Sequence, residues 1–511
     1  MLLRLASAGL LAVTLLLAPA ATPQTPATHP ASSKAPIKKL PAAKFPAHAK
    51  HKTSTTRTSA TKHTTTKLAT ARTSTSKIPA SKPRTDEAVV ATAPVVAHPA
   101  RSAAYSPVSA HISPARTLAT REEVIGQITE KLANPPIGIE NAAQLRPFFD
   151  QVHQLELNPQ GPVVRVLQFG DSHTAADMFT GALRTLFQTK WGDGGAGFSY
   201  AGYPFAGYRI HGTKRQQSID WIVEGTHFRD LGDDAMVGMG GVSLSTDHPG
   251  SWVSLDADAT SLQVQYLTQP GGGPIEIYDG DSLLATVSTD GPTAAGHFDS
   301  PVEAGTHHFE VRTTEEAPVR LLGMTTENAS GVTYEAIGLN GAEASLLLRW
   351  DEPLASAYMQ QVDPALIVLA YGTNEASDHN WTEESYAAML RSLIARTRRL
   401  APNAAILVIG PPDRDLRVSR HGWAPFAGVD RIVAAQRATC KQMGCAYWDQ
   451  RTRMGGFGSM HDWVAVEWAQ ADHTHFTGEG YNELASAFFL DLVQQYNTYE
   501  GSSSLAQGGT K

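Results

Sequence analysis

Residues 163–187 read VVRVLQFGDSHTAADMFTGALRTLF, and this stretch decides the fold. Its first part, Val163–Phe169, is a β-branched apolar run of the kind found in buried parallel strands. The part after the corner has the apolar spacing of a helix, and Gly-Asp-Ser forms that corner. A serine in this position, Ser172, is either an ordinary helix N-cap or a nucleophile held at the carboxyl end of a parallel sheet.

Similar strand and helix units recur in the last third of the chain. ALIVLAYG (Ala365–Gly372) and AAILVIGPP (Ala404–Pro412) have the composition of two further buried strands, and CAYWD (Cys445–Asp449) that of a short one. Stretches with helical spacing lie between and after them. This alternation predicts an α/β fold, a parallel sheet with helices on both faces. We expect order to begin at Thr120, because TREE (Thr120–Glu123) has the form of a capping box.

The middle of the chain has a different pattern. From residue 214 to 331 there is no amphipathic helix, and short alternating runs such as SLQVQYL and HHFEVRT are separated by Gly, Pro, Asp and Ser. This spacing predicts an all-β sandwich or jelly roll inserted into the α/β domain. The α/β domain is then discontinuous, with parts at 118–213 and 332–496. Residues 497–511 are expected to form a disordered tail.

The first 20 residues have the pattern of a secretory signal peptide. A single positive charge, Arg4, precedes an apolar stretch from Leu5 to Leu17, and Ala18-Pro19-Ala20 resembles a cleavage site. The alternative is an uncleaved membrane anchor, although this stretch is short for a bilayer span, which takes about 20 residues. We therefore expect an exported protein, located in the periplasm or associated with the cell envelope.

Residues 21–117 are basic and lack apolar periodicity. They hold 15 lysines and arginines against two acidic residues, whereas the whole chain has a net charge of −7. A segment of this composition buries too little apolar surface to offset the entropy of ordering, so we expect a disordered linker. Taken alone it resembles a nucleic-acid-binding tail, but export argues against nucleic acid. The two remaining interpretations are a solvated spacer and a tether that contacts anionic envelope polymers.

The chain has two cysteines, Cys440 and Cys445. In an oxidising compartment two cysteines this close are expected to pair and to close a small loop between a helix and the next strand. The alternative is two reduced buried thiols. A metal site at this position is disfavoured, because a second pair of ligands is missing nearby.

ADHTHF near the carboxyl end supplies partners for the serine. Asp472 and His475 are three residues apart, and a turn of that spacing holds a carboxylate against one imidazole nitrogen and leaves the other free. An activated serine needs such a base, oriented by a third group. The alternative is a metal site formed by Asp472, His473 and His475, but no complementary cluster of ligands occurs elsewhere in the sequence.

Two further stretches predict donors for an oxyanion hole. IGLNGAEAS places Gly341 in a turn of small residues, where a backbone N–H approaches a substrate closely. AYGTNEAS places Asn374 just after a predicted strand, with an amide donor. Together with the backbone N–H of Ser172 they make three donors for a tetrahedral intermediate. Taken singly, Gly341 is an ordinary turn residue and Asn374 an ordinary loop cap.

Together, the four stretches resemble the sequence blocks of the SGNH (GDSL-type) hydrolases. GDSHT, GLNGA, YGTNE and DHTH stand in the family's order. The resemblance implies a three-layer, flavodoxin-like sheet with Ser172 as nucleophile, Asp472 and His475 as its partners, and Gly341 and Asn374 in the oxyanion hole. His173 and Glu375 differ from the family's commonest residues but match the branch with GDSH and GTNE. No metal or organic cofactor is implied.

A narrower resemblance is to bacterial O-acetylpeptidoglycan esterases, which carry a carbohydrate-binding-like β domain between the first two blocks. It implies hydrolysis of acetyl esters on muramic acid residues of the cell wall. Three alternatives stay open: an acetyltransferase with the same triad, an esterase for another acetylated polysaccharide, and a non-catalytic wall-binding scaffold.

Overall fold

The structure is a computed structural model that describes residues 120–134, 138–225, 234–420 and 422–508, all within the unit Pro94–Lys511. The predicted signal peptide and the basic linker therefore lie outside the described residues. The predicted capping box is present at Thr120: Thr120 Oγ1 accepts from the backbone N–H of Glu123, and Glu123 accepts from that of Thr120. None of the helices in the described part of the chain has the length and hydrophobicity of a membrane span.

A six-stranded sheet forms the centre of the α/β part. Its order is β1-β17-β14-β13-β2-β12, and β1 alone runs antiparallel to its neighbour. The strands are β1 (Ile139–Glu140), β2 (Val164–Gly170), β12 (Val332–Gly338), β13 (Leu366–Ala370), β14 (Ala405–Ile409) and β17 (Ala446–Trp448). Numbered along the chain, the five parallel strands have the order 2-1-3-4-5, which is that of flavodoxin-like folds. The prediction of a parallel sheet in an α/β fold is confirmed.

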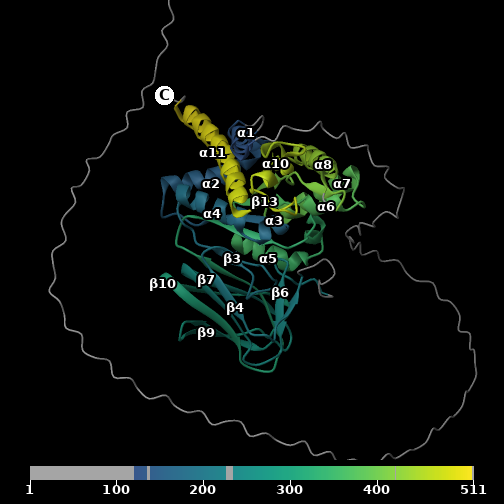
Figure 1. The fold of residues 1–511 in the computed structure, drawn as a ribbon. Coiled ribbons are helices and arrows are strands. Elements are labelled where there is room, and N and C mark those ends of the chain that lie inside the picture. Colours follow the sequence, from purple (N-terminus) through teal and green to yellow (C-terminus); the bar gives the residue numbers. More distant parts are fainter. Residues whose placement is uncertain (1–119, 135–137, 226–233, 421, 509–511) are drawn as a thin grey trace, which may run out of the picture. The chain divides into compact units, whose positions relative to one another are not determined.

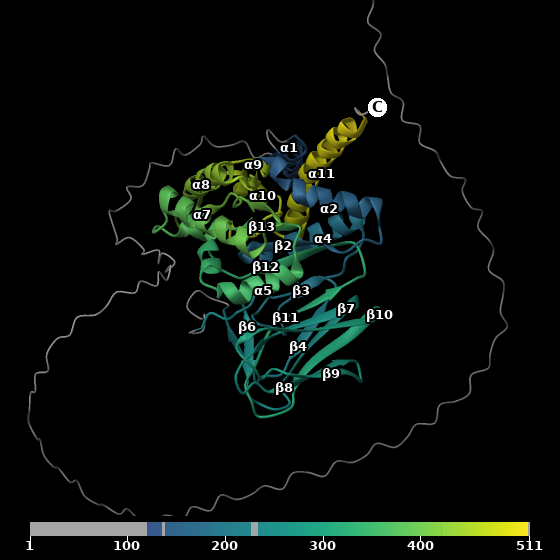
Figure 2. The same cartoon turned by 180° about the vertical axis from the view of Figure 1, so that it is seen from behind.

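Two layers of helices cover the two faces of this sheet. Alternate residues of β2 enter different cores, Val164 and Val166 on one face and Leu167 and Phe169 on the other. The first face packs against α1 (Arg121–Ala133), α2 (Arg146–Leu157), α4 (Met178–Trp191) and α11 (Gly478–Gly508), as labelled in Figure 1. The second face packs against α5 (Glu352–Val362), α7 (Glu383–Leu400) and α8 (Gly428–Met443), which are labelled in Figure 2.

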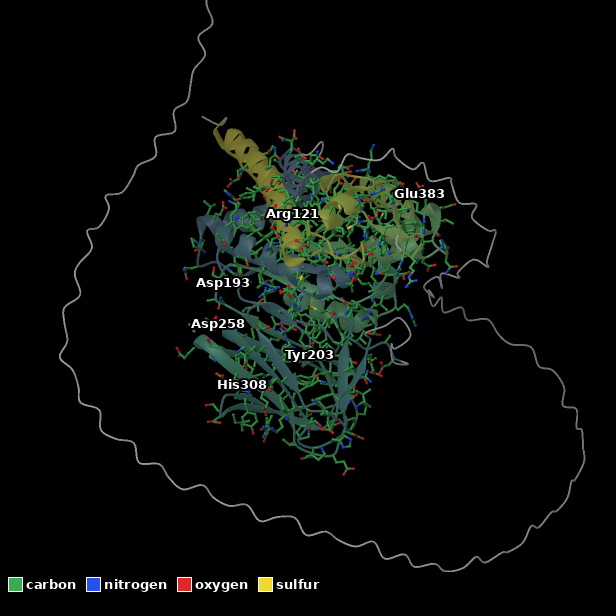
Figure 3. All side chains as sticks on the ribbon, in the orientation of Figure 1. Arg121, Asp193, Tyr203, Asp258, His308 and Glu383 are labelled. Carbon is green, nitrogen blue, oxygen red and sulfur yellow. A yellow bond between two sulfur atoms is a disulfide. The ribbon has the colours of Figure 1, made fainter. Side chains whose placement is uncertain are left out.

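The middle of the chain forms a second, antiparallel sheet of nine strands. They are β3 (Gly197–Ser199), β4 (Lys214–Gln217), β5 (Ile222–Glu224), β6 (Ser243–Thr246), β7 (Trp252–Thr268), β8 (Pro274–Asp279), β9 (Ser282–Ser288), β10 (Ala294–Thr313) and β11 (Val319–Glu327). The long strands β7 and β10 pair over most of their length and carry exposed polar residues, of which Asp258 and His308 are labelled in Figure 3. The predicted all-β character of this segment is therefore present.

A separate inserted domain at 214–331 is not confirmed, and its boundaries stay a prediction. The second sheet already includes β3, which pairs with β11 before residue 214 is reached. Its apolar side chains also share one continuous core with the second face of the central sheet. Tyr358 of α5 joins the two parts directly, because its hydroxyl donates to the backbone oxygens of Tyr266 (2.6 Å) and Gly296 (2.9 Å). The two sheets thus fold around shared apolar side chains.

The expected disorder after residue 496 is wrong for residues 497–508, which continue α11. Tyr499 packs against Phe149 of α2 with ring centroids 5.7 Å apart. This part of the helix therefore has an apolar contact that the local sequence does not predict. The shorter elements are the 3-10 helices at Ala142–Leu145 and Ala344–Leu348, α3 (Ser172–Ala175), α6 (Thr373–Ser377), α9 (Gln450–Arg453), α10 (Ser459–Ala465), β15 (Asp415–Arg417) and β16 (Trp423–Pro425).

Candidate active site

The predicted site residues gather where the strand order of the central sheet reverses. β2 lies between β12 and β13, and all three strands end at the same edge. Open α/β sheets bind their ligands at this position. Close packing brings α3 onto the ends of the strands: a Cβ at Gly338 would lie 2.3 Å from the backbone nitrogen of Ala175, so only glycine fits there. Ser172 is the first residue of α3 and therefore stands at the mouth of the crevice.

Ser172, His475 and Asp472 form one hydrogen-bonded relay. The hydroxyl of Ser172 lies 2.8 Å from Nε2 of His475, and Nδ1 of His475 lies 2.7 Å from a carboxylate oxygen of Asp472. The other carboxylate oxygen accepts the backbone N–H groups of Thr474 and His475, both at 3.0 Å. Burial alone would raise the pKa of Asp472, but these hydrogen bonds hold it below its ordinary value. The arrangement supplies a hydroxyl, a base and a group that orients the base.

The loop that carries Asp472 and His475 is closed on itself. Gln470 donates its backbone N–H to the backbone oxygen of His475 at 2.7 Å and its side-chain amide to that of Phe476 at 3.0 Å. Ala469 and Phe476 also form an antiparallel bridge. These bonds fix the distance between the carboxylate and the imidazole independently of the serine.

His473 has a different partner from its neighbour His475. Its Nδ1 lies 2.6 Å from Asp415 of β15, and its ring stacks on Trp423 of β16 with centroids 4.2 Å apart. The backbone of His473 is left-handed (φ 55°), which turns its side chain away from that of His475. The predicted alternative, a metal site of Asp472, His473 and His475, has no such cluster: in the described ranges only His153, Glu156 and Glu500 bring three ligand atoms within 4.8 Å of one another.

Gly341 and Asn374 lie on adjacent turns at the same edge. Gly341 follows β12 in a turn closed by the N–H of Ala342 donating to Leu339, and its φ of 73° is the left-handed conformation that favours glycine. Asn374 lies in the first turn of α6 after β13, and its amide donates one hydrogen to the backbone oxygen of Ala342 at 2.8 Å. That bond ties the two turns together, and the second amide hydrogen of Asn374 is left for another acceptor.

Asp171 and His173 brace the corner around Ser172. The buried carboxylate of Asp171 accepts the backbone N–H of His173 at 2.9 Å and a hydrogen bond from the side chain of Thr373, which joins the ends of β2 and β13. Burial raises the pKa of Asp171 to about 6. Burial and the neighbouring His475 and Arg414 lower the pKa of His173 to about 3, and its Nδ1 lies 2.9 Å from the hydroxyl of Tyr481. His173 is therefore neutral at pH 7.

Glu375 connects the turn that carries Gly341 with the turn that carries Asn374. Its side chain is fully buried, and Oε1 accepts the backbone N–H of Ala344 at 2.8 Å. Burial raises the pKa of Glu375 to about 8, and the nearby acidic Glu343 and Asp171 act in the same direction. A protonated carboxyl thus holds Asn374, its chain neighbour, in register with the turn that carries Gly341.

Glu375 is expected to make the protein less stable as the pH rises. The folded protein holds this proton up to about pH 8, whereas the unfolded chain releases it near pH 4.5. Unfolding in that interval therefore releases a proton, and the free energy of unfolding falls by up to about 1.4 kcal/mol per pH unit. Glu375→Gln keeps the acceptor for Ala344 and removes the titration, so urea unfolding between pH 5.5 and 7.5 should show a shallower slope in the variant.

The exposed Glu316, replaced by glutamine, is the matched control and should leave that slope unchanged. Burial raises the pKa of Asp171 to about 6 and that of Glu335 to about 7, so these groups also lower the free energy of unfolding as the pH rises. Both remain in the two variants. An unchanged slope in Glu375→Gln would show that this carboxyl is already ionised in the folded protein.

Sequence reasoning missed the groups contributed by the segment after β14. Arg414 is mostly buried and donates to the backbone oxygen of Thr373 (3.0 Å) and the hydroxyl of Ser377 (2.7 Å). Arg414 and Asp415 belong to PPDRD (Pro411–Asp415), which follows a buried strand that ends at the same edge, and Trp423 comes after it. Charged residues at the end of a further parallel strand were the available signal.

The remaining predicted residues lie away from the crevice. Trp448 and Trp463 are fully buried and belong to the core. Cys440 and Cys445 form a disulfide between the end of α8 and the start of β17, with Cα atoms 4.7 Å apart. The disulfide lies in the second core and its cysteines are fully buried.

Residues 280–482 match the model of the GDSL-like Lipase/Acylhydrolase family. This range contains Gly341, Asn374, Asp472 and His475, whereas β2 and Ser172 precede it. A search of curated proteins finds no match.

Several esterases are among the solved structures to which the chain is similar. One described as "Peptidoglycan O-acetylesterase in action, 5 min" is 25% identical, covers 69% of this chain and 96% of its own, and has a TM-score of 0.60. A family two carbohydrate esterase from Cellvibrio japonicus is 13% identical over 56% of this chain and 98% of its own, with a TM-score of 0.25. One from Clostridium thermocellum, in complex with cellohexaose, is 14% identical over 54% and 99%, with a TM-score of 0.26.

Proposed function

Since this chain is an SGNH (GDSL-type) hydrolase that resembles peptidoglycan O-acetylesterases, we propose that it is a serine esterase. Its proposed reaction is the removal of O-acetyl groups from a cell-envelope polysaccharide, most simply O-acetylated peptidoglycan. The observation that carries the proposal is the relay of Ser172, His475 and Asp472 at the mouth of the central sheet. Acyl transfer to water needs these three groups and a set of donors for the oxyanion.

Acylation begins when the hydroxyl of Ser172 attacks the acetyl carbonyl. Nε2 of His475 takes the hydroxyl proton, and Asp472 holds the imidazole in the required tautomer and stabilises its charged form. The tetrahedral oxyanion is bound by the backbone N–H groups of Ser172 and Gly341 and by the second amide hydrogen of Asn374. His475 then gives its proton to the sugar oxygen, and the C–O bond to the sugar breaks to leave an acetyl-serine.

Deacylation repeats these steps with water. His475 removes a proton from a water molecule as its oxygen attacks the acetyl carbonyl, and the same oxyanion forms again. Collapse of this intermediate returns the proton to Ser172 and releases acetate. Both half-reactions balance with water as the sole co-reactant, so the chain's own residues supply every proton transfer.

We also propose that the protein is exported and works at the cell envelope. The support is the pattern of residues 1–20, and the basic segment 21–117 has the charge needed to contact anionic envelope polymers. Substrate on the outer side of the membrane is then within reach of the esterase.

Acetate release from two polymers tests the substrate. We expect initial rates on O-acetylated peptidoglycan to exceed those on acetylated xylan at equal ester concentration, and base-treated peptidoglycan to give no acetate. Preference for xylan would overturn the peptidoglycan assignment while leaving the esterase intact. Movement of acetyl groups onto an added glycan acceptor, without free acetate, would replace the esterase by an acetyltransferase. Absence of any ester cleavage would support a wall-binding scaffold.

A further inference from the structure

A second cavity lies far from Ser172, at the other end of β2. It has a volume of about 220 Å³ and is lined by residues of β2, α5, β7, β10, β11 and β12. Arg165, which lines it, precedes Ser172 by seven residues of extended chain, a separation of about 20 Å. The cavity is therefore distinct from the crevice that holds the Ser–His–Asp relay.

Two buried polar atoms among the residues that line this cavity have no partner. Glu335 is only 1% exposed, and its Oε1 accepts from the hydroxyl of Thr333 at 2.9 Å, but its Oε2 has no hydrogen bond among the described residues. The hydroxyl of Thr325 on β11 is also buried without a partner. Leaving such groups unsatisfied costs free energy, so a ligand that bonds to both would recover it.

The single arginine at the cavity is already engaged. Arg165 donates Nε and Nη2 to the two carboxylate oxygens of Glu327 at 2.5 and 2.7 Å, and Nη1 to the backbone oxygen of Val362 at 3.1 Å. Asp299 adds a third carboxylate to the lining, and it already takes one amide hydrogen of Gln263. The lining thus carries three carboxyl groups and one arginine, whose guanidinium is already bonded to one of them.

The charges around Glu335 also favour the binding of a cation. Burial, and then the charge of Glu327, raise the pKa of Glu335 to about 7, against the lowering effect of Thr333, Arg165 and the backbone N–H of Phe198. A cation beside Oε2 would favour the ionised carboxyl. Gly197 of β3 packs directly on this side chain, and a Cβ there would lie 2.5 Å from Cγ of Glu335, so only glycine leaves room for the glutamate.

We propose that this cavity binds a primary ammonium group, carried by a ligand of the size of one sugar or one amino acid. An ammonium has three donors and no acceptor, which suits Glu335 Oε2, the hydroxyl of Thr325 and one further acceptor of the lining. An amino sugar and a lysine-like side chain share this chemistry. The proposal does not depend on the esterase assignment, because none of these residues takes part in the relay.

Calorimetric titration at pH 7 with two matched pairs of probes tests the proposal on the full chain. One pair is glucosamine and N-acetylglucosamine, and the other is Nα-acetyl-lysine amide and its Nε-acetylated form. At least one ammonium probe should bind about 10-fold or more tightly than its acetylated counterpart, and the pair that responds identifies the source of the ammonium. Equal affinity within both pairs, or no binding by any probe, would overturn the proposal.

Two variants locate the binding. Glu335→Gln removes the charge at nearly constant shape, and Thr325→Val removes the unpartnered hydroxyl; each should weaken binding of the responding probe about 10-fold or more. Glu316→Gln, on the exposed loop before β11, should bind as the parent does. Circular dichroism spectra that match that of the parent check that each variant is folded. Full binding in both folded variants would place the ammonium elsewhere and end the proposal.

Discussion

Replacing Ser172 by alanine is expected to lower kcat/KM for a small chromogenic acetyl ester by roughly 10⁴–10⁶-fold. The hydroxyl lies 2.8 Å from Nε2 of His475, and no other side chain at the crevice supplies a nucleophile in contact with that nitrogen among the described residues. Residual turnover would come from the oxyanion donors, which still polarise the ester when water attacks directly. Steady-state rates measured over a range of ester concentrations give the ratio.

Ser392→Ala is the matched control for this change. Ser392 is exposed on α7 and bonds only to the preceding turn, so the same substitution there should leave the rate within about 2-fold. Near-unchanged esterase activity in Ser172→Ala would contradict the role of this hydroxyl and leave the non-catalytic scaffold as the interpretation. Circular dichroism spectra of both variants should match that of the parent, because Ser172 is half-buried and alanine is no larger.

Asp472→Asn is expected to lower kcat by roughly 10²–10⁴-fold. Asparagine occupies the same space, but its amide nitrogen can donate to Nδ1 of His475 and favour the tautomer in which Nε2 carries the proton. That tautomer is unable to accept the proton of Ser172. The lower end of the range reflects exposure, since the side chain of Asp472 is 47% exposed and solvent screens part of its charge.

The control for charge alone is Asp281→Asn in the exposed turn between β8 and β9, which should have no measurable effect on kcat. KM for the ester should change little in Asp472→Asn, because the carboxylate contacts the imidazole and the loop backbone and not the substrate. A normal kcat in Asp472→Asn would mean that the closed loop orients His475 without the carboxylate. A large rise in KM at normal kcat would assign Asp472 to substrate binding.

The loop that holds Asp472 and His475 fixes the relay through its own hydrogen bonds. Gln470 closes the loop through the backbone oxygens of His475 and Phe476, and His473 fastens it to the β15–β16 hairpin through Asp415. Groups held in this way need little rearrangement when the reaction begins. The hairpin thereby links the conformation of the segment after β14 to the position of the base.

The local sequence was sufficient to predict much of the central sheet. β2, β13 and β14 are short runs of Val, Ile, Leu and Ala between polar turns, and such runs bury themselves wherever a parallel sheet forms. The capping box at Thr120 depends on four consecutive residues and appears as predicted. The positions of Ser172, Gly341 and Asn374 at strand ends follow for the same reason, since each directly succeeds an apolar run that has to stop at the edge of the sheet.

Contacts between distant segments decided the rest. The helical continuation of residues 497–508 begins with Tyr499 against Phe149, about 350 positions earlier in the chain, and no local pattern specifies that pair. The second sheet shares its core with α5 and the central sheet because the apolar faces of both meet, whereas alternation along a strand says only that one face is buried. The partners of His473, the protonation of Glu375 and the lack of a hydrogen bond at Oε2 of Glu335 likewise depend on which described groups surround them in space. Sequence thus determined which residues stand at the ends of strands, and the tertiary structure decided what each of them faces, because hydrogen bonds and burial depend on neighbours that the chain brings together from afar.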